Sequence, residues 1–256
     1  MTNHALLHGR HVLVPRGGEL GERLASLLRE AGATVTTAPL IRFTAAENPS
    51  AVAAALERLA EGRYDWLTVT SATTVTVLSE GDAVIPATTR VAAVGEATAS
   101  ALRGAGHRVD FVPEHDGSAA GMLREWPGGG ASALLLQSAI AAPTLAEGLA
   151  ALGLAVDVVA AYRTLPVDAP RDVVDAAHAG LFDAILLTSA SVARQVARQL
   201  HPLPVSTLLV CIGAPTAQAA SEAGLSVAAI ATRSSAEALV DAVADALTHN
   251  LPEHDS

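Results

Sequence analysis

Two stretches of the chain, "YDWLTVTSATTVTVL" (Tyr64–Leu78) and "FDAILLTSASVARQV" (Phe182–Val196), follow one pattern. Each begins with an aromatic residue and an aspartate, continues through a short apolar run, and reaches Thr-Ser ahead of a helix-like segment. Phe182 follows Tyr64 by 118 residues, and Ser189 follows Ser71 by the same number. A short apolar run that ends in Thr-Ser predicts a buried strand followed by an N-capped helix. The chain therefore contains this strand-turn-helix unit twice.

The repeat extends beyond these two stretches. "VAAVGEATASALRGAGHRV" (Val91–Val109) is similar to "LVCIGAPTAQAASEAGLSV" (Leu209–Val227), again 118 residues later. "GATVTTAPLIR" (Gly32–Arg42) is similar to "GLAVDVVAAYR" (Gly153–Arg163), 121 residues later. Any doubly wound protein shows loose self-similarity, but a nearly constant offset through three motifs favours duplication.

Strand-like apolar runs alternate with segments of helical period along the whole chain. The expected strands are Val12–Val14, Ala33–Thr37, Trp66–Thr70, Arg90–Val94, Arg108–Val112, Ser132–Leu136, Val156–Ala160, Ala184–Thr188, Ser206–Ile212 and Ser226–Ile230. The expected helices are Glu19–Glu30, Ser50–Ala60, Thr74–Ser79, Ala97–Ala105, Ser118–Glu125, Pro143–Leu152, Ala190–Leu200, Pro215–Ala223 and Ala236–Thr248. Such alternation predicts α/β architecture, with parallel sheets covered by helices on both faces.

Two extended-prone segments, Pro39–Phe43 and Tyr162–Val167, lie between α/β units. If both cross between domains, one domain comprises residues 1–38 plus 166–256 and an inserted domain comprises residues 39–165. We therefore predict two doubly wound, flavodoxin-like domains joined by a two-stranded linker, with the active cleft between them.

Composition excludes several classes of protein. Half of the 256 residues are apolar, but no apolar run is long enough to cross a bilayer, and the first residues lack a secretory leader. With a single cysteine, the expected location is the cytoplasm. The net charge of −10 argues against a nucleic-acid binder. All 16 basic residues are arginines, and the lack of lysine excludes a pyridoxal phosphate Schiff base and a Walker A loop.

Ligands of open α/β sheets bind beyond the carboxyl ends of the strands. The residues there that could bind an anionic substrate are Arg16, Ser71, Gly95, Ser189, Gly213 and Thr216. Ser71 and Ser189 stand at N-cap positions, so capping alone is one interpretation. The other is that these helix N-termini bind carboxylates through free N–H groups and the positive end of the dipole. Arg16 either binds a carboxylate through two parallel hydrogen bonds or is a solvated loop residue.

Tyr162, one of two tyrosines, lies in the second connecting segment. A phenol there could donate a proton to a leaving hydroxyl, although a packed aromatic of the linker is the alternative. The nine histidines show no metal-ligand spacing, and His8 and His11 have no third partner in the sequence. Cys211 is interpreted as a core residue. We expect neither a metal nor a cofactor.

In their order and spacing, eight motifs together resemble the uroporphyrinogen-III synthase family. They are "VLVPRGGE", "GATVTTAPLI", "YDWLTVTSATTV", "VAAVGEATASAL", "VDFVPEHDGSAAGML", "LGLAVDVVAAYRT", "FDAILLTSASV" and "CIGAPTAQAASEAG". The residues that match the family's motifs are Arg16, Ser71, Tyr162, Ser189 and Thr216. Two positions depart from the pattern: Pro215 replaces the first threonine of "GPTTA", and Gln137 stands where arginine is often found.

The resemblance implies a cofactor-independent hydro-lyase of tetrapyrrole biosynthesis, on the route to haem, sirohaem and cobalamin. Its substrate would be hydroxymethylbilane, a linear tetrapyrrole, with Tyr162 as the general acid. A monomer, in transient contact with the enzyme that forms hydroxymethylbilane, is the expected assembly. Two alternatives stay open: a two-domain binding protein or sensor for an anionic ligand, and a regulatory protein that kept the fold and lost activity. The lack of a basic helix-turn-helix extension counts against a transcriptional role.

Overall fold

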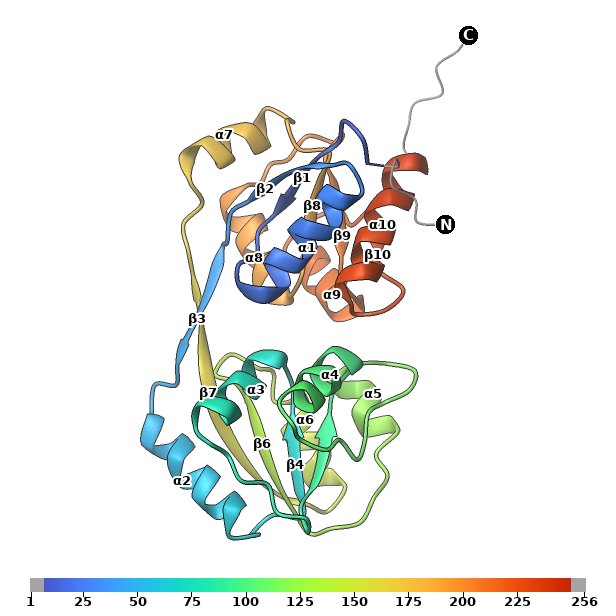
Figure 1. Ribbon diagram of the computed structural model, residues 1–256. Helices are drawn as coiled ribbons and strands as arrows, with labels where there is room; N and C mark the ends of the chain where they lie inside the picture. Colours follow the sequence, from blue (N-terminus) through green and yellow to red (C-terminus); the bar gives the residue numbers. More distant parts are fainter. Residues whose placement is uncertain (1–6, 250–256) are drawn as a thin grey trace. The chain divides into compact units, whose positions relative to one another are not determined.

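The computed structural model describes residues 7–249, which form two compact units (Figure 1). Unit 1 contains the described residues up to Arg42 together with those from Leu165 onward, and unit 2 is Phe43–Thr164. Each unit has its own five-stranded sheet.

Unit 1 has the strand order β10-β9-β8-β1-β2, and its described pairings are all parallel. Its strands are β1 (His11–Val14), β2 (Thr34–Thr37), β8 (Ala184–Leu187), β9 (Leu208–Cys211) and β10 (Ala229–Ile230). Its helices are α1 (Gly18–Glu30), α7 (Arg171–His178), α8 (Ala190–Gln199), α9 (Ala214–Glu222) and α10 (Ala236–His249). Leu24 of α1 and Leu239 of α10 pack with Val12 and Leu186 on one face of the sheet, while α8 and α9 lie behind it (Figure 1).

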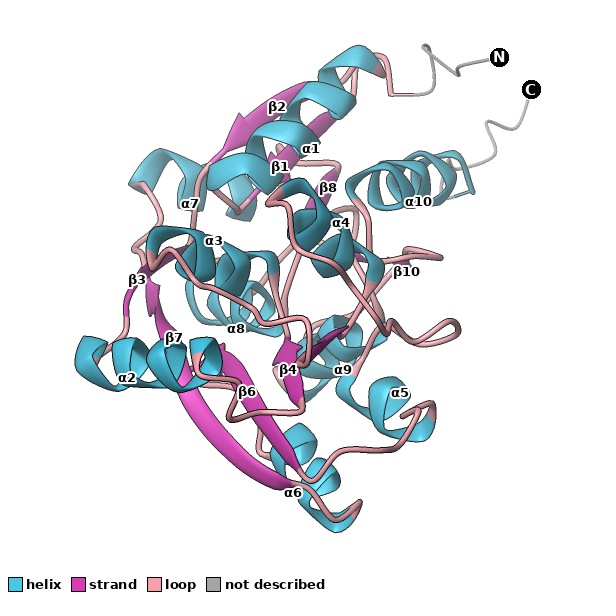
Figure 2. Cartoon of the chain, turned by 60° about the horizontal axis from the view of Figure 1, so that its bottom comes forward, coloured by secondary structure: helices cyan, strands magenta, loops and turns pink. Residues whose placement is uncertain are grey.

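Unit 2 has the strand order β3-β7-β6-β4-β5, and the pairings among β4, β5, β6 and β7 are parallel. Its strands are β3 (Ile41–Ala45), β4 (Trp66–Val69), β5 (Arg90–Ala93), β6 (Ser132–Ser138) and β7 (Ala155–Pro166), of which β3 and β7 carry the chain into and out of the unit. Its helices are α2 (Pro49–Ala60), α3 (Ala72–Glu80), α4 (Glu96–Gly104), α5 (Ala119–Arg124) and α6 (Thr144–Ala151). Figure 2 shows β7 as a long strand beside β6.

Helices cover both faces of the unit 2 sheet. Leu56, Leu78 and Leu102 from α2, α3 and α4 form one apolar cluster. Met122 and Leu149 from α5 and α6 form the other. The prediction of two-domain, doubly wound α/β architecture is thus confirmed.

The duplication is also visible in the structure, residue by residue. Phe111 bridges Ala92 of β5, and the residues 118 positions later, Ala229 and Val210, pair in β10 and β9. The hydroxyl of Thr89 donates to the carbonyl of Tyr64 at 2.7 Å, just as Thr207 donates to Phe182 at 2.9 Å. Equivalent contacts between equivalent residues indicate a common origin of the two halves.

The aspartates of the repeated motif anchor the amino ends of the sheets. Asp65 accepts hydrogen bonds from the backbone N–H of Ala131 at 2.7 Å and of Ser132 at 3.0 Å. Asp183 likewise accepts from the backbone N–H of His11 at 2.7 Å. Each carboxylate ties its strand to the neighbouring strand, as expected for turn or cap residues.

Three expectations about elements were wrong. Arg108–Val112 makes only an isolated bridge, because the Asp110 carboxylate accepts from the backbone N–H of Val91 at 2.7 Å in place of a strand ladder. The segments Val156–Ala160 and Tyr162–Val167 belong almost entirely to one continuous strand, β7. Helix α7 was missed, although its buried Val173 and Ala177 stand at helical spacing after Pro170. The repeat could have revealed it, since its flanking Pro170 lies 121 residues after Pro49, the first residue of α2.

Candidate functional site

The carboxyl edge of the unit 2 sheet has the geometry of a ligand site. From β4 the chain continues to β5 on one side, whereas β6 lies on the other side of β4 and leads on to β7. Ligands of doubly wound sheets bind where the strand order reverses in this way. Here that point lies between the ends of β4 and β6, beside residues Ser71 and Gln137.

Ser71 stands at this point because β4 ends at Val69 and α3 begins at Ala72. Its hydroxyl accepts a hydrogen bond from the backbone N–H of Thr74 at 3.2 Å, which makes it the N-cap of α3. Ser71 is therefore the N-cap of α3, and the structure adds a second contact. The Ser71 hydroxyl lies 3.0 Å from the phenol oxygen of Tyr162.

Tyr162 is held firmly in this contact. It lies in β7 opposite Ser138, directly after a bulge at which Ala161 of β7 has no partner in β6, and its carbonyl accepts from the backbone N–H of Ala139 at 2.9 Å. Bulges often re-aim a side chain next to a functional site. The ring of Phe43 meets the ring of Tyr162 edge to face, with centroids 5.3 Å apart. Only 7% of Tyr162 is exposed, so the phenol is fixed and largely shielded from water.

The other tyrosine, Tyr64, is engaged at the opposite end of the sheet. Its phenol donates to Asp157 at 2.5 Å and accepts from Arg58 Nε at 2.8 Å, while Arg58 also pairs with Asp157 at 2.6 Å. Burial and the Asp157 hydrogen bond raise the pKa of Tyr64. Burial opposes ionisation of Asp157, but the hydrogen bonds from Tyr64 and Arg58 outweigh it and lower the pKa of Asp157. Tyr64 is thus a structural residue, which leaves Tyr162 as the tyrosine at the carboxyl edge.

Three helices begin after a glycine that cannot cap them with a side chain. They are α1 after Gly17, α4 after Gly95 and α9 after Gly213. These helices have no side-chain cap at their N-termini, after Gly95 in unit 2 and after Gly17 and Gly213 in unit 1. In general the N-terminus of a helix attracts negative charge, and α4 carries Glu96 in its first turn.

The carboxyl edge of the unit 1 sheet repeats the arrangement of unit 2. Here the strand order reverses between β1 and β8, which precede Arg16 and Ser189. Ser189 caps α8 by accepting from the backbone N–H of Val192 at 3.2 Å. Thr188, beside it, is 7% exposed, and its buried hydroxyl has no hydrogen-bond partner among the described residues. The sequence places Thr188 in a candidate stretch at the end of a strand, Thr188–Ser191, but the prediction singled out only its neighbour Ser189.

Two further predicted residues are largely covered. Thr216, in the first turn of α9 after Pro215, is 5% exposed, so only a small part of it is open to a ligand. Gln137, at the end of β6, is 8% exposed. The side chain buried at this edge of the sheet is therefore a neutral amide and not an arginine guanidinium.

The remaining reactive side chains belong to the framework. Cys211 is buried in β9, and burial raises the pKa of its thiol to about 12. The His11 ring lies 2.8 Å from the Thr36 hydroxyl and packs on the edge of Phe182. Within residues 7–249, no three His, Cys, Asp or Glu side chains gather as metal ligands. In the same range, no helix has the length and apolar character needed to span a membrane.

Sequence comparison relates the chain to proteins of one kind. The family model for uroporphyrinogen-III synthase HemD matches residues 22–241. The porphyrin biosynthesis protein HemD of Ruminiclostridium josui is 29% identical over 245 residues, which cover 92% of this chain and 48% of that protein. The chain therefore spans about half the length of this curated relative.

Structural comparison shows the same fold in solved proteins. A mutant uroporphyrinogen III synthase from the extremely thermophilic bacterium Thermus thermophilus matches with a TM-score of 0.68 and 22% identity, over 94% of this chain and 100% of that chain. Uroporphyrinogen-III synthetase from Helicobacter pylori matches with a TM-score of 0.59 and 17% identity, over 91% and 97%. At these identities the likeness concerns the fold alone.

Proposed function

Because the chain belongs to the uroporphyrinogen-III synthase family, we propose that it closes hydroxymethylbilane, a linear tetrapyrrole, to uroporphyrinogen III. The observation that carries this proposal is the contact between Tyr162 and Ser71 at the carboxyl edge of a sheet, within a chain that the family model matches along most of its length. The product leads to haem, sirohaem and cobalamin. The reaction loses one water and needs no oxidant or reductant.

Tyr162 serves as the general acid in this proposal. Its phenol protonates the terminal hydroxyl of hydroxymethylbilane, water leaves, and an azafulvene cation forms. The substituted carbon of the last pyrrole attacks this cation and gives a spiro intermediate. The intermediate then fragments and closes again with that ring inverted, and a proton is lost. Proton transfer from a positioned side chain contributes about 10²-fold or more to such a step.

Ser71 orients the phenol for this proton transfer. Ser71 Oγ accepts the N–H of Thr74 and lies 3.1 Å from Thr74 Oγ1 and 3.0 Å from the phenol oxygen of Tyr162; in the proposed arrangement its own proton goes to the phenol oxygen. The proton of the phenol then remains available for the substrate. This arrangement assigns Ser71 two roles, as a helix cap and as a positioning residue.

Substrate binding rests on many weak contacts with the acetate and propionate side chains. Arg16, the helix N-termini at Gly95, Ser189 and Gly213, and the Thr216 hydroxyl provide N–H and O–H donors for carboxylates. Spontaneous closure gives the isomer without ring inversion, so the enzyme must fix the conformation of a flexible chain. Direct contact with the enzyme that forms hydroxymethylbilane would limit that spontaneous loss.

The test is to add the purified protein to freshly made hydroxymethylbilane, oxidise the products, and separate the I and III isomers. We expect the III isomer to predominate. Formation of the I isomer alone, at the rate seen without protein, would reject the activity and leave a binding or regulatory role.

A further inference from the structure

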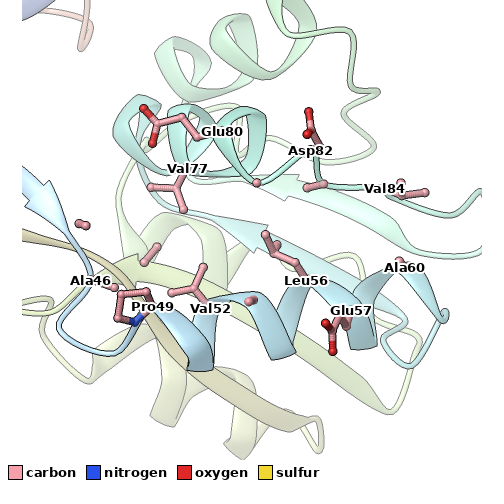
Figure 3. A pocket seen from close by; sticks show the side chains of 15 residues that line it. Ala46, Pro49, Val52, Leu56, Glu57, Ala60, Val77, Glu80, Asp82 and Val84 are labelled. Atoms are coloured by element: carbon pink, nitrogen blue, oxygen red, sulfur yellow. The ribbon is translucent and has the colours of Figure 1, made fainter.

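Unit 2 contains a groove that the proposed reaction does not use. It lies between α2 and the C-terminal end of α3, and the loop after α3 forms part of its wall (Figure 3). Its volume is about 470 Å³, within the range of small-molecule sites in proteins. Ser71 and Tyr162 do not line it.

The inside of the groove is apolar. Helix α2 contributes side chains along its whole length, from Pro49 through Val52 and Leu56 to Ala60. Figure 3 shows Val52 and Leu56 pointing toward the opposite wall, from which Val77 points back toward them. Gly81 lets the walls approach closely, because a Cβ there would lie 2.6 Å from Leu56 Cδ1. An apolar body of small-molecule size therefore fits this space.

The rim of the groove is acidic on both walls. Glu57 stands on α2, and Glu80 and Asp82 stand on the opposite wall; all three are exposed, and in Figure 3 the Glu80 and Asp82 carboxylates point away from α2 while that of Glu57 points away from α3. None of the three has an ion-pair partner among the described residues, and no arginine lines the groove. The last turn of α3 also carries no basic residue, so the negative end of this helix is uncompensated by its own side chains.

We propose that this groove binds an organic cation: an apolar body that fills the space, with one ammonium or guanidinium group at the rim beside Glu80 and Asp82. Two carboxylates and a helix C-terminus attract positive charge at one end, and the apolar walls take the rest of the molecule. The groove has the size of a single small molecule, so a small cation matches it better than a protein surface does.

The occupied groove would contact two elements of the candidate site. Ala161, which lines it, directly precedes Tyr162 in β7, and α3 begins at its cap Ser71. A ligand in the groove therefore touches the strand and the helix that hold the Ser71–Tyr162 contact. The backbone amide NMR signals of Ser71 and Tyr162 report this coupling directly. Binding of a ligand in the groove does not itself depend on the proposed reaction.

Three probes of equal shape test the proposal: 1-adamantanamine, 1-adamantanol and 1-adamantanecarboxylate, titrated into isotopically labelled full-length protein and followed by amide NMR. We expect the amine to bind with a Kd of about 1 mM. Its shifts should centre on α2 and residues 80–84 and extend to Ser71 and Tyr162. The alcohol should bind about threefold more weakly and the carboxylate more weakly still, and the preference should fade in high salt.

Matched variants separate this groove from general attraction to an acidic protein. The double variant Glu80→Gln/Asp82→Asn should weaken binding of the amine about three- to tenfold, whereas Glu147→Gln, at an exposed position of α6, should not. Ala53→Trp, at an exposed groove position of α2, should abolish binding, whereas Ala150→Trp, at an exposed position of α6, should leave it intact. The proposal would be overturned if the three probes bound with equal affinity or if the shifts spread over the surface. It would also be overturned if the paired variants had equal effects, or if only a basic peptide bound specifically in the groove.

Discussion

At the scale of single residues, the phenol of Tyr162 decides the proposed chemistry. Tyr162→Phe keeps the ring that packs against Phe43 but removes the proton donor. We expect kcat to fall by one to two orders of magnitude with little change in KM, because proton donation assists only the loss of water. Initial rates of III-isomer formation measure this. Wild-type turnover in the variant would eliminate Tyr162 as the acid.

Ser71 should act through Tyr162, and a double-mutant cycle can show it. Ser71→Ala removes both the cap of α3 and the contact to the phenol, so we expect it to lower kcat and to reduce the free energy of unfolding by about 1 kcal/mol. Combined with Tyr162→Phe, it should cost much less additional activity than it does alone. Asn48→Ala removes the cap of α2 in the same unit and should lower stability without lowering kcat. If the effects of the two substitutions on kcat were additive, Ser71 would not act through the phenol of Tyr162.

Asp65 should make stability depend on pH. Hydrogen bonds from the Ala131 N–H and from Ser132 lower the pKa of Asp65. A lowered pKa stabilises the fold above the ordinary aspartate value of about 3.9, and the contribution is lost as pH falls through the lower folded value. Asp65→Asn should therefore cost about 1 kcal/mol at pH 7 and much less near pH 3 in urea unfolding. Asp241→Asn, at an exposed position of α10, serves as the control; an equal deficit from Asp65→Asn at both pH values would contradict this account.

The sequence predicts which residues stand at the carboxyl edges better than it predicts their contacts. The helix-start pattern located Ser71 and Ser189, because capping is a local property. Ser71 and Tyr162 are 91 residues apart, and Tyr162 directly follows a bulge in β7 for which the sequence carries no signal. The Arg58–Tyr64–Asp157 network was missed for the same reason, because its members meet only through sheet pairing.

At the scale of elements, the first turn of α1 depends on a glycine. A Cβ on Gly21 would lie 2.1 Å from the carbonyl oxygen of Arg16, whereas nothing lies within 4 Å of a Cβ on Gly104, the last residue of α4. Gly21→Ala should lower the free energy of unfolding by about 2 kcal/mol or more and should displace Arg16. Gly104→Ala should raise it by about 0.5 kcal/mol. Urea unfolding measures both; equal effects would show that the α1 turn relaxes freely.

Element type and order were largely predictable because parallel strands and their covering helices have clear hydrophobic patterns. The failures were local. Arg108–Val112 has the composition of a strand, but Asp110 takes the hydrogen bond that a ladder would use. Helix α7 is short, but the spacing of Val173 and Ala177 after Pro170 is helical, and comparison of the two halves of the chain also indicates it.

At the scale of the whole molecule, the boundaries of the two structural units do not coincide with the boundaries of the two sequence repeats. The backbone N–H of Val167 donates to the Leu40 carbonyl at 2.8 Å, so the chain leaves and re-enters unit 1 at neighbouring points. The fragment of residues 43–164 contains both apolar clusters of unit 2 and should fold alone. Halves divided between Gly128 and Gly129 should each stay unfolded and should regain structure when mixed, because each sheet needs strands from both. Circular dichroism measures all four samples; an unfolded 43–164 fragment, or halves that fold separately, would contradict this division.

The interleaving of the two sheets also records an ancestry. The first half of the chain supplies β1 and β2 to one sheet and β3, β4 and β5 to the other, and the second half supplies the reverse: β6 and β7 to unit 2, and β8, β9 and β10 to unit 1. A gene fusion of two identical chains that had exchanged strands as a homodimer produces this arrangement directly. The half-length ancestor would then have had no folded monomer. On this account, fusion would have made permanent, in one polypeptide, an association that such an ancestor could form only at sufficient concentration.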